Sequence, residues 1–222
     1  MNSVPFAFYD AMTCLLDKHS PSHCLKLAGL IGAVVSETAQ KIAYEWIKID
    51  HNGRFFRTTY RTLIDNSLIA LFDPSYRRCT SFTIRRSIEE PSTDAIVAYQ
   101  NVPTIRLYFY TSAISKEFVK RIHSLRFVSY LQFGSGSADL IPGMMKNFVP
   151  RKTLKHIGFR LEDYVFDEPT ETLFLDLIKQ EQFWYCHLPA KSNSTVKRII
   201  TDWKENSAKF IGKRVSTRMK SD

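Results

Sequence analysis

Two cysteines and two histidines near the N-terminus of this 222-residue chain are close enough in sequence to suggest a metal site. They are Cys14, His19, His23 and Cys24. Thiolate and imidazole are ligands that zinc prefers, and two histidines four residues apart can share one face of a helix. Pro21 lies between the histidines and interrupts the helix that this geometry needs. We therefore expect no metal site here.

A second candidate is the glycine-rich segment Gly134-Ser135-Gly136-Ser137, which lies between an expected strand and an expected helix. The backbone N–H groups of such a turn can bind phosphate. The segment has neither the Gly-Lys-Ser/Thr of a P-loop nor the third glycine of the dinucleotide fingerprint. We interpret it as a flexible loop and expect no nucleotide or other cofactor.

Catalysis would need a nucleophile beside a base, or a pair of carboxylates. No Gly-x-Ser-x-Gly motif occurs, and the nearby serine Ser129 has no recognisable base partner. The carboxylate pairs Glu162-Asp163 and Asp167-Glu168 precede an expected helix, where they would favour its N-terminal dipole. We therefore expect a non-enzymatic protein with no catalytic residues.

The charge of the chain invites a nucleic-acid interpretation. There are 31 Lys+Arg against 22 Asp+Glu, a formal net charge of +9. The basic residues are dispersed in small clusters and form no basic arm, so nucleic-acid binding stays an alternative to protein binding. No apolar run approaches the roughly 20 residues that span a bilayer, and no signal peptide is apparent. We expect a cytoplasmic or nuclear protein with no membrane contact, whose four cysteines are reduced and buried.

The elements that position these side chains alternate between strand and helix in the second half of the chain. The expected pairs are Ile105–Tyr110 with Ser115–Leu125, Phe127–Phe133 with Ala138–Phe148, Lys155–Leu161 with Thr170–Gln180, and Phe183–Leu188 with Ser194–Asn206. The strand starts are spaced by roughly 22–28 residues, inside the range of leucine-rich repeats. In the first half, 43–49, 54–61 and 78–86 have extended patterns.

This alternation predicts an α/β fold with parallel strands and helices on one face, in a short, irregular solenoid like that of leucine-rich repeats. An ordinary α/β domain with accidental spacing is the alternative, because the asparagine ladder of leucine-rich repeats is absent. We expect a helical segment at 1–50 and an α/β domain at 51–222, with a soft boundary near 89–101. The basic tail 212–222 lacks periodicity, and we expect it to be frayed.

Six aromatic residues of the expected strands could form an exposed, target-binding sheet surface. They are Tyr108, Tyr110, Tyr130, Phe159, Trp184 and Tyr185. Tyrosine and tryptophan are frequent at protein interfaces, and nucleic-acid bases also stack on aromatic rings. Packing in the core is the alternative use of these rings.

The N-terminal segment 4–16 begins with an apolar residue and a proline, and continues as a helical pattern ending in paired leucines. It resembles the opening of an F-box. The resemblance implies that an apolar face of this segment binds a Skp1-like adaptor, through Val4, Pro5, Phe6, Phe8, Leu15 and Leu16. The alternative is that these residues only pack against the solenoid as its N-terminal cap.

The whole chain resembles a family of nematode proteins related to F-box proteins. The resemblance rests on the N-terminal segment and on two further segments, 174–183 and 194–206. It implies an F-box-like N-terminus followed by a partly leucine-rich-repeat-like region that recognises a target protein, with no catalytic residues. On this basis we expect a protein-interaction module that serves as a substrate-recognition subunit of an SCF-type ubiquitin ligase.

Overall fold

The computed structural model describes residues 43–49, 55–61, 77–84, 94–161, 163–189 and 191–217. The chain divides into two compact units, Met1–Trp46 with Arg57–Thr80, and Ile47–Phe56 with Ser81–Asp222. The second unit contains most of the described residues and all of the helices among them. The predicted adaptor face and the Cys/His group near the N-terminus lie outside the described residues.

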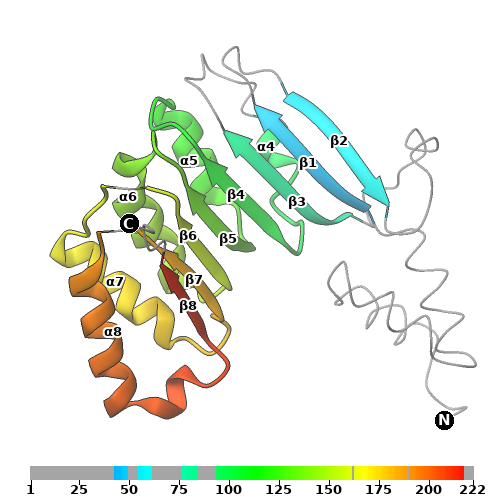
Figure 1. Ribbon diagram of the computed structural model, residues 1–222. Helices are drawn as coiled ribbons and strands as arrows, with labels where there is room; N and C mark the ends of the chain where they lie inside the picture. Colours follow the sequence, from blue (N-terminus) through cyan, green and yellow to red (C-terminus); the bar gives the residue numbers. More distant parts are fainter. Residues whose placement is uncertain are drawn as a thin grey trace, which may run out of the picture. The chain divides into compact units, whose positions relative to one another are not determined.

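All eight described strands contribute residues to the second unit, where they form one sheet (Figure 1) in the order β2-β1-β3-β4-β5-β6-β7-β8. The strands are β1 (Ala43–Ile49), β2 (Phe55–Arg61), β3 (Arg77–Ile84), β4 (Ile105–Phe109), β5 (Val128–Phe133), β6 (His156–Phe159), β7 (Tyr185–Leu188) and β8 (Arg214–Thr217). From β4 to β8, each strand pairs in parallel with the next one along the chain. The N–H of Tyr110 donates to the carbonyl of Ile84 at 2.7 Å and joins β4 to β3.

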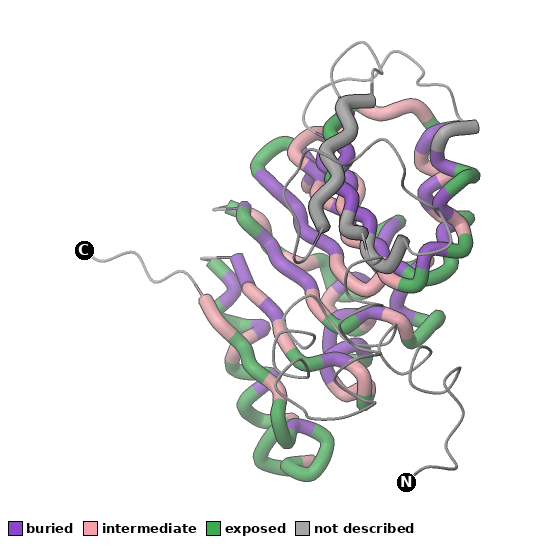
Figure 2. The backbone as a smooth tube through the Cα atoms, turned by 90° about the vertical axis from the view of Figure 1, so that its right-hand side faces the viewer, coloured by how far each residue is buried: buried purple, intermediate pink, exposed green. Residues whose placement is uncertain are grey.

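The helices lie on one face of this sheet (Figures 1 and 2). They are α4 (Asp94–Val97), α5 (Lys116–Ser124), α6 (Ile141–Phe148), α7 (Glu168–Lys179) and α8 (Asn193–Glu205), with the 3₁₀ turns η3 (Ala138–Leu140), η4 (Val149–Arg151) and η5 (Ser207–Phe210). From α5 onward, one helix lies in each connection between neighbouring parallel strands. Parallel strands need such crossovers, because a short turn cannot return the chain to the same end of the sheet.

Local sequence explains these elements. In β4, Ile105, Leu107 and Phe109 are buried while the residues between them are half-buried, which is the two-residue period of a strand. Helix α5 begins where the Ser115 hydroxyl accepts a hydrogen bond from the N–H of Phe118 at 3.1 Å. The same alternation occurs in β7, where Cys186 and Leu188 are buried while Tyr185 and His187 are half-buried.

The core lies between the sheet and the helices, and a row of phenylalanines runs through it. Phe109, Phe133 and Phe159 occupy neighbouring strands, with ring centroids 5.6 and 5.7 Å apart. The three rings are stacked, and each is at most 1% exposed. The prediction that Phe159 belongs to an exposed sheet surface is therefore wrong. Its strand position has the same parity as Ile157, so it points toward the helices.

The predicted α/β architecture with parallel strands is confirmed, and the four predicted strand–helix pairs agree with the observed bounds to within two residues, except that α6 begins three residues after its predicted start, because 138–140 form the 3₁₀ turn η3. The expectation of a frayed tail from residue 212 onward is wrong for Arg214–Thr217, which pair with Tyr185–Leu188 as strand β8. This four-residue segment has no apolar run of its own. Its extended conformation depends on the edge of β7, which supplies the pairing partners.

Candidate binding surface on the uncovered face of the sheet

None of the described helices covers the face of the sheet opposite to them (Figure 1). By strand register, this face carries aromatic, basic and amide side chains. We call it the open face. Its side chains come from strands β4 to β8 and from the residues that directly follow β4 and β6. They are Arg106, Tyr108, Tyr110, Tyr130, Gln132, His156, Arg160, Tyr185, His187, Arg214 and Ser216. Residues in register on parallel strands share a face, so the pairing brings these side chains together in rows.

The first row crosses five strands. Its members, in register from β4 to β8, are Arg106, Tyr130, His156, Tyr185 and Arg214. The His156 ring lies 4.2 Å from that of Tyr130 and 4.3 Å from that of Tyr185, measured between centroids. The Arg214 guanidinium carbon lies 5.9 Å from the Tyr185 ring centroid. The row is therefore a line of touching rings with an arginine at each end.

The second row, in register two residues further along each strand, consists of Tyr108, Gln132, Gly158, His187 and Ser216. Hydrogen bonds connect it to the first row and to Tyr110. The Tyr130 hydroxyl donates to Oε1 of Gln132 at 2.7 Å, and Nε2 of Gln132 donates to the Tyr110 hydroxyl at 3.1 Å. On the β8 side, the Ser216 hydroxyl lies 2.8 Å from that of Tyr185 and 2.9 Å from Nδ1 of His187. These bonds hold the polar ends of the side chains in place, so that the surface is organised before any partner arrives.

The glycine-rich segment closes one end of this surface by close packing. A Cβ on Gly136 would lie 2.7 Å from the carbonyl oxygen of Tyr110, and one on Gly134 would lie 2.4 Å from a Tyr110 ring carbon. The Gly134 N–H donates to the carbonyl of Phe109, and the buried Ser137 hydroxyl donates to the carbonyl of Gly134 at 2.8 Å. The glycines thus let the chain pass against the end of β4, and the segment is held by these bonds.

The charged side chains of the open face are all positive. Strands β4 to β8 contain no aspartate or glutamate, whereas Arg106 and Arg214 lie within them and Arg160 follows β6 directly. The described carboxylates from residue 105 onward belong to helices, their caps, turns or loops. They are Glu117, Asp139, Asp163, Asp167, Glu168, Glu171, Asp176, Glu181, Asp202 and Glu205.

Two of the three rings of the first row, those of Tyr130 and His156, are uncharged at neutral pH. Burial, followed by the positive Arg106 and His187, lowers the pKa of His156 to about 4. Burial, followed by the neighbouring Tyr108, raises the pKa of Tyr130 above its ordinary value. The charge of the face therefore comes from its arginines, while the centre of the row is neutral and aromatic.

Of the six residues predicted for this surface, the structure brings four tyrosines together on it, namely Tyr108, Tyr110, Tyr130 and Tyr185. Trp184 lies just before β7, is 52% exposed, and meets the His156 ring edge-on at 5.9 Å. Phe159 lies on the opposite face, as described above.

Sequence reasoning missed the polar members of the surface. They are Arg106, Gln132, His156, Arg160, His187, Arg214 and Ser216. A search at every second residue from each predicted tyrosine would have found Arg106, Gln132 and His187, since they lie two residues away on the same strand. Arg214 and Ser216 had no such signal, because their strand was not predicted.

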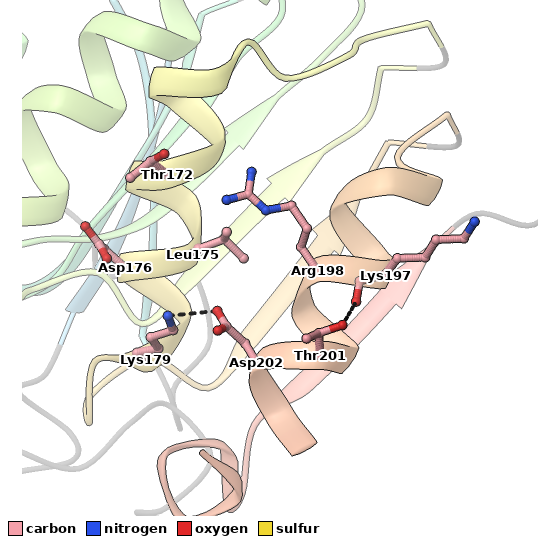
Figure 3. A pocket seen from close by; sticks show the side chains of 8 residues that line it. All are labelled: Thr172, Leu175, Asp176, Lys179, Lys197, Arg198, Thr201 and Asp202. Atoms are coloured by element: carbon pink, nitrogen blue, oxygen red, sulfur yellow. Dashed lines mark hydrogen bonds and ion pairs between the residues drawn. The ribbon is translucent and has the colours of Figure 1, made fainter. Parts of the chain in front are cut away.

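A hollow of about 390 Å³ lies between α7 and α8 (Figure 3). Lys179 of α7 pairs with Asp202 of α8 at 2.8 Å, and Arg198 pairs with Glu171. The Glu171 carboxylate also accepts a hydrogen bond from the Thr195 hydroxyl at 2.7 Å. Because these cations are paired across the hollow, its charged groups hold the two helices together.

The carboxylates and the cysteine considered as chemical groups in the sequence have structural roles where the structure describes them. Asp167 caps α7 by accepting from the N–H of Thr170 at 2.9 Å, and Asp163 pairs with Lys191 at 2.6 Å. Cys186 is buried, and burial raises its thiol pKa to about 12. In the part of the chain that the structure describes, no three His, Cys, Asp or Glu side chains gather as metal ligands would.

None of the described helices has both the length and the apolar character that crossing a membrane requires. Comparisons of the chain with protein-family models, with curated proteins and with solved structures found no match. The open face is thus the candidate site that emerges from the described residues on geometry and chemistry alone.

Proposed function

We propose that the protein is a non-enzymatic protein-interaction module whose open face binds a target protein. The observation that carries this proposal is the contiguous row of rings from Tyr108 through Tyr130 and His156 to Tyr185, with centroid separations of 4.9, 4.2 and 4.3 Å. Aromatic and arginine side chains carry much of the binding energy at protein interfaces. Here they lie on a sheet face that none of the described helices covers.

The chain order of the strands supports a solenoid interpretation. From β3 to β8 the strands are adjacent in the sheet in the order in which they occur in the chain, and β4 to β8 are parallel. Each step adds one strand and one helix, as a leucine-rich-repeat solenoid does. We propose that the α/β domain is a short, irregular solenoid whose sheet surface recognises the target.

The surface is suited to binding because its side chains are already ordered and lose little conformational entropy when a partner docks. The Tyr110, Tyr130 and Tyr185 hydroxyls are already hydrogen-bonded to Gln132 or Ser216. Tyrosine has few rotatable bonds, so fixing it costs little conformational entropy. A rigid scaffold of paired strands keeps the rings in register.

A photo-crosslinking experiment tests this proposal. A photoreactive phenylalanine placed at Tyr108 or Tyr185 should form covalent adducts with protein in a cell extract. The adducts should keep their size on nuclease treatment, and mass spectrometry should find peptides of a second protein in them. The same group at Lys120, an exposed position of α5, is the matched control. Adducts at the control position alone would contradict the proposal.

Nucleic-acid binding is the second candidate, because arginines beside stacked aromatic rings also suit single-stranded nucleic acid. The same experiment decides between the two. Adducts at Tyr108 or Tyr185 that lose mass on nuclease treatment and contain no peptides of a second protein would replace the protein-binding proposal by this one. Their yield would then fall steeply as salt is added.

The ligase part of the proposal rests on the resemblance of the N-terminal segment to an F-box. In that proposal the segment binds a Skp1-like adaptor while the open face holds the substrate. The folded protein should then bind purified Skp1, and Phe6→Ala with Leu15→Ala should abolish the complex. Absence of binding by the folded protein would leave the segment as a cap, and would not affect the proposal for the open face.

A further inference from the structure

The open face differs from the rest of the described surface because it carries arginines without carboxylates, whereas the rest carries both signs of charge. Its three arginines have no carboxylate on the strands around them, since β4 to β8 contain no acidic residue. The ion pairs made among the described residues involve Arg121, Lys179, Lys191 and Arg198, which lie on helices or their connections. None of those pairs involves an open-face arginine, so these three guanidinium groups are positioned to attract a negatively charged partner.

The arginines are also spaced in a particular way. Arg106 and Arg214 are the two ends of the first row, and the rings of Tyr130, His156 and Tyr185 lie between them. Four strand-to-strand steps separate β4 from β8, which corresponds to roughly 19 Å. An extended peptide covers that distance in about six residues, since each residue adds about 3.3 Å.

A protein segment fits this pattern better than a nucleic-acid strand. A nucleic-acid strand carries a negative charge at every nucleotide, whereas the first row is positive at its ends and neutral at its centre. The rings of this row also cover part of one another's faces. The His156 centroid lies 4.2 Å from that of Tyr130 and 4.3 Å from that of Tyr185, so the rings are in van der Waals contact. Less ring surface is left for bases to stack on.

We propose that the open face binds an extended protein segment of about six to eight residues that crosses the strands from Arg106 to Arg214, with carboxylates at both ends and apolar side chains between them. This inference rests on the proposed function, and it adds the chemical class of the target. The carboxylates pair with the two arginines, and the apolar centre lies on the row of neutral rings.

Fluorescence anisotropy with short labelled peptides tests the inference. The probe is an eight-residue peptide with two glutamates at each end and leucine, glycine, serine and leucine between them. One control peptide carries lysines in place of the glutamates, and a second carries all four glutamates in the centre with the leucines at the ends. We expect the first peptide to bind at least ten times more tightly than either control, and its affinity to fall as salt is added.

Matched variants locate the binding on the protein. Arg106→Gln with Arg214→Gln should weaken binding of the first peptide at least tenfold, while Arg106→Lys with Arg214→Lys should keep most of it. The control, Lys120→Gln with Lys197→Gln, removes the same charge from exposed positions of α5 and α8 and should leave the affinity unchanged. Thermal unfolding of each variant verifies that the fold is retained.

Three results would overturn the inference: no binding of the acidic-ended peptide, equal loss in the open-face and control variants, or tighter binding of a single-stranded oligonucleotide of eight nucleotides. These results are distinguishable from failure of the proposed function. If photo-crosslinks at Tyr108 or Tyr185 capture protein but the peptide does not bind, only the acidic class is wrong. If they capture no protein at all, the function itself is wrong.

Discussion

The sheet carries one row of aromatic rings on each of its two faces, and the two rows differ in almost every physical respect. On the helix-covered face, the rings of Phe109, Phe133 and Phe159 are stacked nearly parallel, with interplanar angles of 14° and 15°. On the open face, the rings of the Tyr108-to-Tyr185 row are tilted by 34° to 53° and are half-buried. The covered row has no polar atoms, while the open row has hydroxyls, an imidazole and flanking arginines.

This contrast teaches that aromatic content does not by itself distinguish core from surface. Residues that are neighbours in sequence, such as Tyr108 and Phe109, belong to opposite rows because successive side chains of a strand point to opposite faces. The covered row should therefore determine stability, and the open row should determine binding. The following predictions test that division, from the largest expected effect to the smallest.

Replacing Phe133 by alanine should have the largest effect on stability. The substitution leaves a cavity between Phe109 and Phe159 beneath the helices, and we expect the free energy of unfolding to fall by about 3–5 kcal/mol. Tyr130→Ala on the open face should cost less than about 2 kcal/mol, because its side chain is only half-buried. Urea unfolding of both variants measures the difference. Equal losses of unfolding free energy in the two variants would contradict the assignment of stability to the covered row and binding to the open row.

Two glycines provide a sharper test of close packing. Gly136→Ala should lower the free energy of unfolding by about 1–3 kcal/mol, because its Cβ would lie 2.7 Å from a backbone oxygen that cannot easily move. Gly143→Ala in α6 is the control, since no atom lies within 4 Å of its Cβ position. Alanine favours a helix over glycine, so this variant should gain up to about 1 kcal/mol. A gain from both substitutions would contradict the close packing at β4.

The helix-covered side depends on caps as well as on rings. Ser115→Ala removes the hydroxyl that accepts from the N–H of Phe118, and should cost about 1 kcal/mol. Ser194→Ala, at an exposed position in the first turn of α8, should change stability by no more than about 0.5 kcal/mol. Thermal unfolding of the two variants provides the measurement. If the two changes are equal, the cap does not stabilise α5.

An effect no larger than that of the cap is expected from the pH dependence of the open face. The pKa of His156 is about 4 in the folded protein and near 6.5 when unfolded. Between these values the unfolded chain binds a proton that the folded protein does not, so stability falls as pH drops from 6.5 to 4. Solvent screens part of this effect, and we expect about 1 kcal/mol.

Replacing His156 by glutamine isolates that contribution. The variant should lose less stability than the wild-type protein between pH 7 and pH 4.5, measured by urea unfolding at both values. Carboxylates titrate alike in the two proteins, so the difference belongs to His156. An unchanged pH dependence would show that this imidazole is freely protonated in the folded state.

The alternation of strands and helices from residue 105 onward was predictable, because local periodicity carries that information. Phe118, Ile122 and Leu125 recur at helical spacing and are all buried. Within strands the prediction was weaker. Phe159 and Tyr185 both occur in short strands, and nothing in their local sequences says which face of the sheet each ring occupies.

The candidate surface was predicted only as a set of tyrosines. Its rows depend on register, which brings His156 between Tyr130 and Tyr185 although the three are 26 and 29 residues apart in sequence. The charge asymmetry likewise depends on the tertiary structure, since arginines and carboxylates are interspersed along the chain. They separate in space only because carboxylates occur in helices, turns and loops while Arg106 and Arg214 occur in strands.

The sequence alone determined the order and approximate bounds of the strands and helices in the second half of this protein, because hydrophobic period and capping residues act over a few positions. Only the tertiary structure decided which rings are core and which are surface, and that Arg214–Thr217 form a strand. Those outcomes depend on pairing with distant segments: an edge such as that of β7 supplies the hydrogen-bonding partners, and the helices decide which face of the sheet is buried.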